Sequence, residues 1–249
     1  MSANEQAVTN KRKPVLELSD VTSAIGEAKS IRLSNFTGQL FEGDVVQVRL
    51  GAHHDPRDLL SLVLGLGTPL AGRIQFAGKD WLGRNYRQHY QMRSQIGRIF
   101  ASAAWVQSLT VGENIRLAQL HHGVGASIIT DRIAYWTERL SGRHLSTVRR
   151  SFAHRPTFVD DPILQICQWI RAVCNQPKLL LFDRPFRFIT QDLHLAFVSV
   201  IDELANKGAS VLWFSSGHEE FHLQIESRLV QWSVPGDVLQ ACEVPLNHE

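Results

Sequence analysis

Short apolar-rich runs alternate along the chain with stretches whose apolar residues recur at helical spacing. Residues 44–50, 179–182 and 210–214 are apolar-rich runs of strand length, each flanked by polar or turn-forming residues. Such runs are typical of strands that are buried on both faces of a sheet. Residues 126–140, by contrast, place apolar side chains three or four positions apart, which predicts an amphipathic helix.

Applied to the whole chain, these two patterns predict a sheet of strands alternating with helices, an α/β fold. The predicted strands are 15–18, 31–36, 44–50, 72–76, 179–182, 210–214 and 227–233. The predicted helices are 59–66, 126–140, 162–175, 193–204 and 219–225.

The mostly helical block at about residues 101–165 is interpreted as a subdomain inserted into this sheet. Residues 1–14 are polar and lack apolar periodicity, so we expect a flexible tail there. One domain is expected over residues 15–240, followed by a C-terminal tail at 241–249.

Composition narrows the class of protein without identifying it. The 249 residues are 44% hydrophobic and 20% charged with a net charge of +2, which is ordinary for a globular protein and too balanced to predict nucleic-acid binding. The longest apolar stretch, residues 59–66, is far shorter than the roughly 20 residues that cross a bilayer. Residues 1–14 lack the apolar core of a secretory signal. We therefore expect no direct membrane insertion.

The widely spaced cysteines predict buried thiols rather than disulfides.

An acid closes the most informative of the apolar runs. Asp183 follows residues 179–182, which is where a magnesium-nucleotide enzyme places an acid at the edge of a parallel sheet. The next residue is Arg184, a permanent cation.

Four framing segments resemble the ATP-binding cassette (ABC) transporter nucleotide-binding subunit. They are residues 66–74, 96–100, 108–115 and 171–183, which match in order a "P-x-x-G-x-I" segment, the strand entering the Q-loop, an "LTVxENI" segment and an "LLLLDEP" segment. The resemblance extends from about residue 15 to 239. It implies a P-loop ATPase-like sheet core, the ABC ATPase fold, with an inserted helical subdomain.

The family's phosphate-binding loop, G-x-x-x-x-G-K-[ST], falls on residues 51–58. Gly51 matches the first glycine, but Pro56 replaces the second and has no N–H to offer a phosphate. Arg57 stands for the lysine and Asp58 for the magnesium-binding hydroxyl residue. ATP with Mg²⁺ is the cofactor that the resemblance implies, and these changes argue against it.

The remaining functional positions of the family are altered as well. In the order general base, adenine-stacking aromatic, Q-loop glutamine, signature, D-loop aspartate and switch histidine, they fall on Arg184, Ile25, Ala101, residues 159–163, Thr190 and Ser216. His218 would replace the switch histidine only after a loop shift. Residues 140–144 look like a signature but lie too far before Asp183.

Two further sites are considered. His53 and His54 are candidate metal ligands, but no third ligand follows at fitting spacing, so no metal site is expected. Phe100, Trp105 and Leu109 lie in an apolar cluster at the family's permease-docking groove. Packing of the subdomain hinge is an equal alternative for that cluster.

The resemblance therefore implies a catalytically degenerate subunit that acts as a structural or regulatory partner of an active ABC ATPase and a membrane permease. We expect a dimer, weak or absent ATP hydrolysis, and a cytoplasmic location on the inner face of the membrane. A divergent but active ATP-hydrolysing subunit and an ABC-like interaction module without a transporter are the alternatives.

Overall fold

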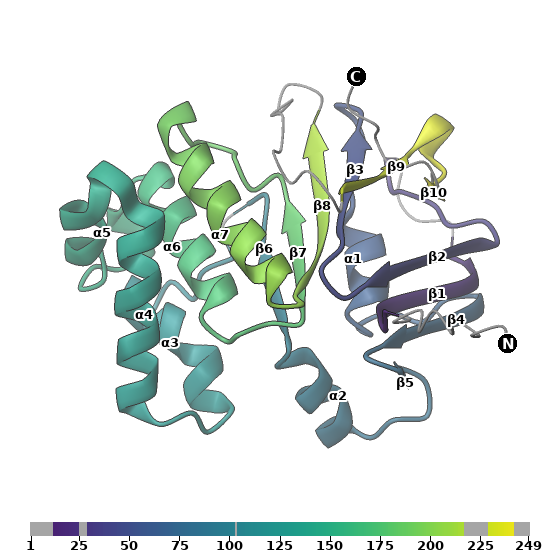
Figure 1. Ribbon diagram of the computed structural model, residues 1–249, viewed down its shortest axis with the longest axis horizontal. Coiled ribbons are helices and arrows are strands. Elements are labelled where there is room, and N and C mark those ends of the chain that lie inside the picture. The colour runs from purple at the N-terminus through teal and green to yellow at the C-terminus, as the bar shows by residue number, and fades with distance from the viewer. Residues whose placement is uncertain (1–11, 25–28, 103, 217–228, 242–249) are drawn as a thin grey trace, which may run out of the picture.

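The computed structural model describes residues 12–24, 29–102, 104–216 and 229–241. They form two sheets and a layer of helices (Figure 1). The strands of the larger sheet are Val45–Leu50 (β3), Ile96–Ile99 (β6), Leu179–Asp183 (β7), Ser210–Ser216 (β8), Leu229–Ser233 (β9) and Gln240–Ala241 (β10). Their order is β10-β9-β3-β8-β7-β6, and every pair is parallel except β9 with β10.

The N-terminal part of the chain forms a smaller antiparallel sheet with the order β2-β1-β4-β5. Its strands are Pro14–Thr22 (β1), Phe36–Phe41 (β2), Ala71–Phe76 (β4) and Lys79–Asp80 (β5). The short helix Arg57–Val63 (α1) lies between the two sheets (Figure 1). Helix Tyr86–Arg93 (α2) follows the smaller sheet.

Helices cover the opposite face of the larger sheet. They are Val111–His121 (α3), Ala126–Ser141 (α4), Leu145–Ser151 (α5), Asp161–Val173 (α6) and His194–Asn206 (α7). Short 3-10 turns at Gly142–His144, Pro156–Phe158, Gln191–Leu193 and Pro235–Asp237 connect elements. No helix in the described ranges is long and apolar enough to cross a membrane.

The apolar runs are continuous because both faces of the central sheet are covered. Along β7, Leu180 and Phe182 face the helical layer, whereas Leu179 and Leu181 face α1 and the smaller sheet. Successive side chains of a strand point to opposite faces, so one uninterrupted apolar run supplies two separate cores.

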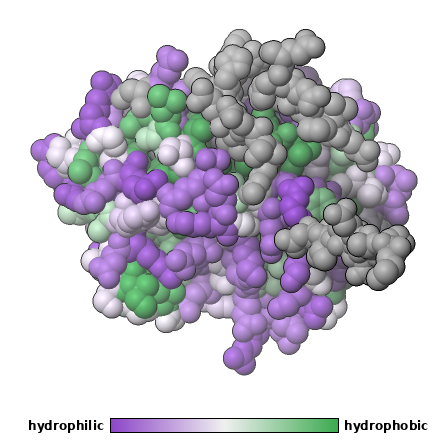
Figure 2. All heavy atoms as spheres, in the orientation of Figure 1, coloured by the Kyte–Doolittle hydropathy of each residue, from purple (hydrophilic) through white to green (hydrophobic). Residues whose placement is uncertain are grey.

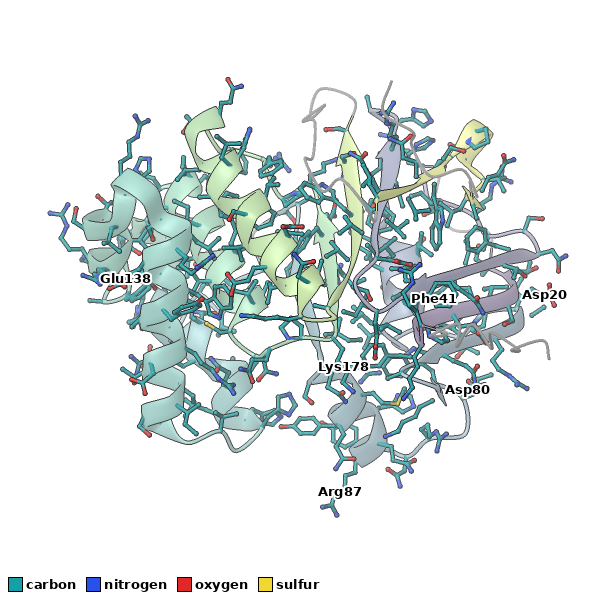
Figure 3. The ribbon with its side chains drawn as sticks, viewed as in Figure 1. Asp20, Phe41, Asp80, Arg87, Glu138 and Lys178 are labelled. Carbon is teal, nitrogen blue, oxygen red and sulfur yellow. The ribbon has the colours of Figure 1, made fainter. Side chains whose placement is uncertain are left out.

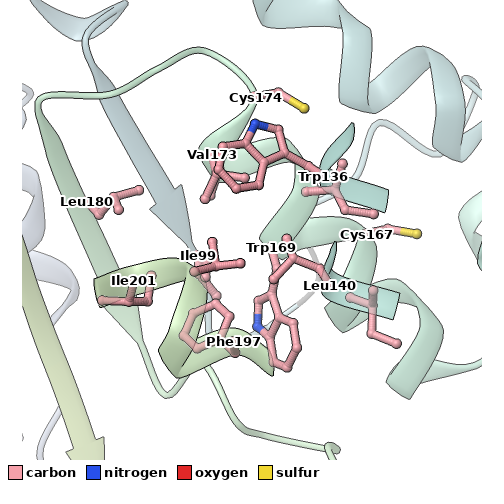
Figure 4. Packing of buried hydrophobic residues seen from close by; sticks show 14 of the residues in the cluster. Ile99, Trp136, Leu140, Cys167, Trp169, Val173, Cys174, Leu180, Phe197 and Ile201 are labelled. Atoms are coloured by element: carbon pink, nitrogen blue, oxygen red, sulfur yellow. The ribbon is translucent and has the colours of Figure 1, made fainter. Parts of the chain in front are cut away.

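Trp169 stands at the centre of the core on the helical side (Figure 4). It is fully buried, and its ring lies 4.3 Å from that of Phe197 between centroids. Cys167 and Cys174 are free thiols in the same core, as expected, and burial raises the pKa of each to about 12.

Two predicted elements differ from the structure. The strand predicted at 31–36 is wrong, because this segment makes only isolated bridges at Ser30 and Arg32 and the strand begins at Phe36. Asn35, at φ 50°, turns the chain just before that strand. The helix predicted at 59–66 begins and ends earlier, as α1, and Gly65 follows it at φ +62° with no room for a Cβ beside Trp81.

Other differences have simple causes. The pattern analysis did not predict α2 because Met92 is its one buried residue among the eight. The predicted helices at 126–140, 162–175 and 193–204 correspond to α4, α6 and α7. The helix predicted at 219–225 lies outside the described residues.

The face seen in Figure 2 is mainly hydrophilic, with an apolar patch over the ends of α3 and α4, where Leu117, Leu120 and Ile128 are exposed. Lys178 lies just before β7, at the lower edge of the sheet (Figure 3). Strands β3, β7 and β8 all end at the upper edge, where the carboxyl ends of the parallel strands meet (Figure 1). Ligands of α/β sheets bind at that edge.

Gly97 allows β6 and α6 to approach closely, because an added Cβ would lie 2.2 Å from the Ala172 carbonyl oxygen. We expect Gly97→Ala to lower the free energy of unfolding by about 1–3 kcal/mol, since backbone must move. Gly125→Ser is the matched control. The nearest atom to its Cβ is 4.0 Å away, and it lies at the N-cap of α4, so a change below about 0.5 kcal/mol is expected. Urea unfolding measures both, and equal effects would contradict the close approach.

Candidate functional site

The candidate site forms where the central strands end. The chain leaves β3 at Leu50, turns through residues 51–56 and enters α1. Leu50 pairs with Ser216 at the end of β8, and Asp183 pairs with Phe214. Parallel register therefore brings the predicted loop and the predicted acid to one edge of the sheet.

The side chain of His54 fills the loop from within. The amide of Gly51, the first residue of the predicted loop, donates to His54 Nδ1 at 2.9 Å. His54 is only 7% exposed, and burial lowers its pKa, as does the neighbouring His53. An imidazole thus engages one backbone amide of the predicted phosphate loop.

Arg184 closes the same loop from the other side. Its guanidinium donates to Asp183 Oδ1 at 2.9 Å and to the carbonyl oxygen of His54 at 2.8 Å. Its backbone has φ 47°, a left-handed conformation that costs free energy in a residue other than glycine. The Arg184 amide donates to the Phe214 carbonyl at 2.9 Å, which holds this conformation against β8.

Asp183 is buried between cations. Burial raises the pKa of its carboxyl above the ordinary value, and the positive charges of Arg184 and Arg98 oppose that rise. Arg98 itself is half-buried, with its guanidinium 4.2 Å from the centroid of the Phe100 ring. Sequence reasoning did not single out Arg98, because it lies within a strand rather than in a motif.

The other two acids of the loop are engaged locally. Asp55 Oδ2 accepts from Arg57 Nε at 2.7 Å, and this hydrogen bond lowers the pKa of Asp55. Asp58 Oδ2 accepts from the Ser30 hydroxyl at 2.6 Å. The Arg57 side chain is directed to Asp55 rather than across the loop, unlike a lysine that neutralises phosphates.

A third group reaches this loop from the far end of the chain. Asp237 Oδ1 lies 3.2 Å from His53 Nε2 and 3.1 Å from His54 Nε2. Sequence spacing did not show this carboxylate, because it comes from the turn after β9, far along the chain. The three residues form a group able to hold a metal ion within the described part of the chain.

The signature position, residues 159–163, leads into α6. Asp160 is the N-cap of that helix but its side chain makes no capping hydrogen bond. A cleft of about 290 Å³ lies beside it, lined by Arg150, His154, Phe158 and Ile163 among others. The signature-like residues 140–144 instead end α4, with Ser141 buried.

The apolar cluster at the predicted docking groove is only partly open. Trp105 is 8% exposed, and the Arg171 guanidinium covers it at 4.5 Å from a ring centroid. Phe100 and Leu109 are half-buried, whereas Val106 is 44% exposed. The burial of Trp105 favours hinge packing for that residue.

The remaining predicted positions are placed as follows. The carbonyl of Ala101 accepts from the Arg187 side chain at 2.9 Å. Thr190 is the N-cap of the turn Gln191–Leu193, and Ser216 ends β8. Ile25 and His218 lie outside the described residues.

The residues present do not fit Mg-ATP bound in the usual way. A phosphate cradle needs free backbone amides, but the Gly51 amide is engaged and Pro56 has none. A hydroxyl ligand for magnesium is replaced by Asp58, which is bonded to Ser30. The cation that faces Asp183 is Arg184, whose guanidinium takes the place of a metal ion beside the acid.

Comparison with known proteins identifies the family. No protein-family model matches the chain. The lipoprotein-releasing system ATP-binding protein LolD of Ruegeria sp. is 30% identical over 161 residues, covering 64% of this chain and 67% of that protein. An uncharacterized ABC transporter ATP-binding protein of Methanocaldococcus jannaschii is 23% identical over 209 residues, covering 83% and 89%.

A solved structure confirms the predicted fold. A dimeric, post-hydrolysis ATP-binding cassette bound to ADP and Pi has a TM-score of 0.69 and 18% identity, covering 87% of this chain and 93% of that one. The likeness in three dimensions thus extends over most of the chain, and the LolD relative supplies the sequence relationship. The chain belongs to the family of ABC transporter ATP-binding subunits.

Proposed function

We propose that this chain is a catalytically degenerate ABC subunit that serves as a structural or regulatory partner of an active ABC ATPase and a membrane permease. One observation carries the proposal. The loop at the phosphate-binding position is held closed by hydrogen bonds from the Gly51 amide to the His54 ring and from the Arg184 side chain to the His54 carbonyl. A loop in this state retains the fold of the family without its nucleotide site.

The chemistry of Asp183 and Arg184, at the end of β7, supports the same proposal. Hydrolysis needs a group that accepts a proton from the attacking water, and the general-base position holds Arg184, which cannot do so at neutral pH. Phosphoryl transfer also depends on positioned cations and a positioned water. Here the cation beside Asp183 is committed to the protein's own carboxylate.

Pairing with an active relative would leave both composite sites incomplete. In the family, each site combines the phosphate loop of one chain with the signature of the other. The loop here is closed, and the signature position carries Asp160 and Asp161, whose charges oppose a phosphate. Phe158, 77% exposed at the same cleft, suits packing against a partner chain rather than gripping a nucleotide.

A partner role also needs a surface for the permease, and Val106 is the best-placed residue for it. It lies in the segment between β6 and α3, beside the buried Trp105. We therefore assign the contact to Val106 and its exposed surroundings, with Trp105 beneath them as support. The cytoplasmic, membrane-associated location follows from this docking.

The proposed loss of turnover is tested on the complex recovered through a tag on this chain. We expect no phosphate release above the background of a complex whose partner ATPase lacks its own P-loop lysine. Asp183→Asn and Arg57→Ala should leave that background unchanged. Turnover that either substitution abolishes would establish the divergent but active ATPase instead.

The structural role of Arg184 is tested by its removal. Arg184→Ala should lower the free energy of unfolding by about 3 kcal/mol, because it leaves the buried Asp183 carboxylate without its ion-pair partner and with the positive charge of Arg98 alone to offset its burial. Arg57→Ala is the matched control, because it removes another arginine–aspartate pair of the same loop, in which the arginine side chain is 72% exposed. Its loss should cost no more than about 1 kcal/mol. Urea unfolding of both variants provides the measurement, and an equal small loss would mean that Arg184 does not hold the loop.

The docking assignment is tested by pull-down from detergent-solubilised membranes. Val106→Asp should remove most of the integral-membrane chain that co-purifies, because a charge enters an apolar contact. Leu117→Asp is matched in exposure, at 45% against 44%, and should leave the pull-down intact. Retention of the membrane chain by Val106→Asp, with normal folding, would rule out this surface.

A further inference from the structure

His53, His54 and Asp237 bring three ligand atoms together at the loop. One atom from each side chain lies within 4.8 Å of the other two. The Asp237 Oδ1 atom is central, at 3.2 Å from His53 Nε2 and 3.1 Å from His54 Nε2. Zinc bonds of about 2.0–2.1 Å place tetrahedral ligand atoms about 3.3–3.4 Å apart, so both distances are already close to those of a coordinated ion.

His54 supplies the second, independent observation. Its side chain is 6% exposed, and its Nε2 atom is buried without a hydrogen bond. Asp237 Oδ1 lies 3.1 Å from this atom and attracts it electrostatically, but the pair is not aligned as a geometric hydrogen bond. A buried polar atom without a well-aligned hydrogen bond costs free energy, which binding of a cation to Nε2 would recover.

Backbone hydrogen bonds hold the three residues in place. The segment 29–33 lies between the loop and the turn that carries Asp237. On one side, the Asp55 amide donates to the Lys29 carbonyl at 2.8 Å. On the other, the Arg32 amide donates to the Asp237 carbonyl at 2.8 Å. The fold therefore positions the backbone on both sides of the cluster, although the His53 side chain itself is exposed.

The ligand set determines which ion fits. Two imidazoles and one carboxylate suit zinc and neighbouring transition metals, whereas Mg²⁺ and Ca²⁺ prefer oxygen ligands. His53 is 61% exposed, so the outer side of the cluster is open to solvent, which can complete the coordination. The positive charge of Arg184, on the carbonyl of His54, opposes the ion and limits its affinity.

We propose that His53, His54 and Asp237 form a binding site for one divalent transition-metal ion of the zinc type. The site shares His54 and its loop with the proposed function, but it uses none of the surface assigned to the permease, and metal binding is measured separately from ATP turnover. The ion would lie on the loop that corresponds to the family's phosphate-binding motif.

Metal binding has a consequence within the loop. The Gly51 amide donates to His54 Nδ1, so the neutral ring carries its proton on Nε2. A metal on Nε2 displaces that proton, which moves to Nδ1 or leaves to solvent. The first outcome breaks the Gly51 hydrogen bond, and the second turns its acceptor into an imidazolate. Both change the environment of the Gly51 amide.

The test uses the purified full chain with Zn²⁺ in calorimetry and Co²⁺ as a spectroscopic probe. We expect one equivalent of Zn²⁺ to bind, visible d–d bands with Co²⁺, and a shifted Gly51 amide resonance in the ¹⁵N-labelled protein. Mg²⁺ should produce none of these. His53→Ala and Asp237→Asn should each weaken Zn²⁺ binding at least about tenfold, as expected for loss of a ligand from a site of three.

Controls separate this site from adventitious binding. His121→Ala/His122→Ala removes the other adjacent pair of histidines, whose rings also lie close together, and should leave affinity unchanged. His53 is exposed, so its substitution should keep the thermal unfolding midpoint and remain informative. Absence of stoichiometric binding, or equal affinity in wild type and Asp237→Asn, would overturn the proposal.

Discussion

The bridge made by Arg184 is the constraint on which the site depends. One guanidinium joins the carboxylate at the end of β7 to the carbonyl of His54 in the loop after β3. In a P-loop nucleotide enzyme, the loop binds the phosphates and the acid helps to bind the magnesium ion, so the ligand joins these two segments. Here a side chain of the protein supplies the positive charge between them. Under the proposed function, this side chain holds the loop in the position that a nucleotide would otherwise stabilise.

The helical layer fixes the residues that follow the bridge. Trp169 Nε1 and Gln165 Nε2 of α6 both donate to the Pro185 carbonyl, at 2.9 and 3.0 Å. The ring of Phe186 packs against those of Trp169 and Phe197. The left-handed backbone at Arg184 is thus held from β8 on one side and from the core on the other.

Most of the fold was predictable because burial leaves a clear pattern. The strand β7 reads directly from its apolar run, and α4 and α6 from their periodicity. The polar helix α2 gave no such pattern, since it buries only Met92. The strand predicted at 31–36 failed because its apolar residues are buried while its backbone makes isolated bridges instead of a ladder.

The candidate site was predictable in chemistry but only partly in geometry. Motif positions identified Gly51, Asp183 and Arg184, and the structure brings them to one edge of the sheet. That His54 occupies the loop, and that Asp237 approaches it, depends on tertiary contacts that sequence spacing does not encode. The sequence predicted His53 and His54 as a pair without a third ligand for the same reason, because Asp237 lies far along the chain from both histidines.

The closed loop is tested most directly by titrating the ¹⁵N-labelled chain with Mg-ATP and following the Gly51 amide. This amide is engaged by His54, so its resonance should stay unchanged at concentrations that saturate an ordinary ATP-binding subunit. A saturable shift of the Gly51 resonance, with release of the His54 ring, would show that nucleotide opens the loop and would contradict the account.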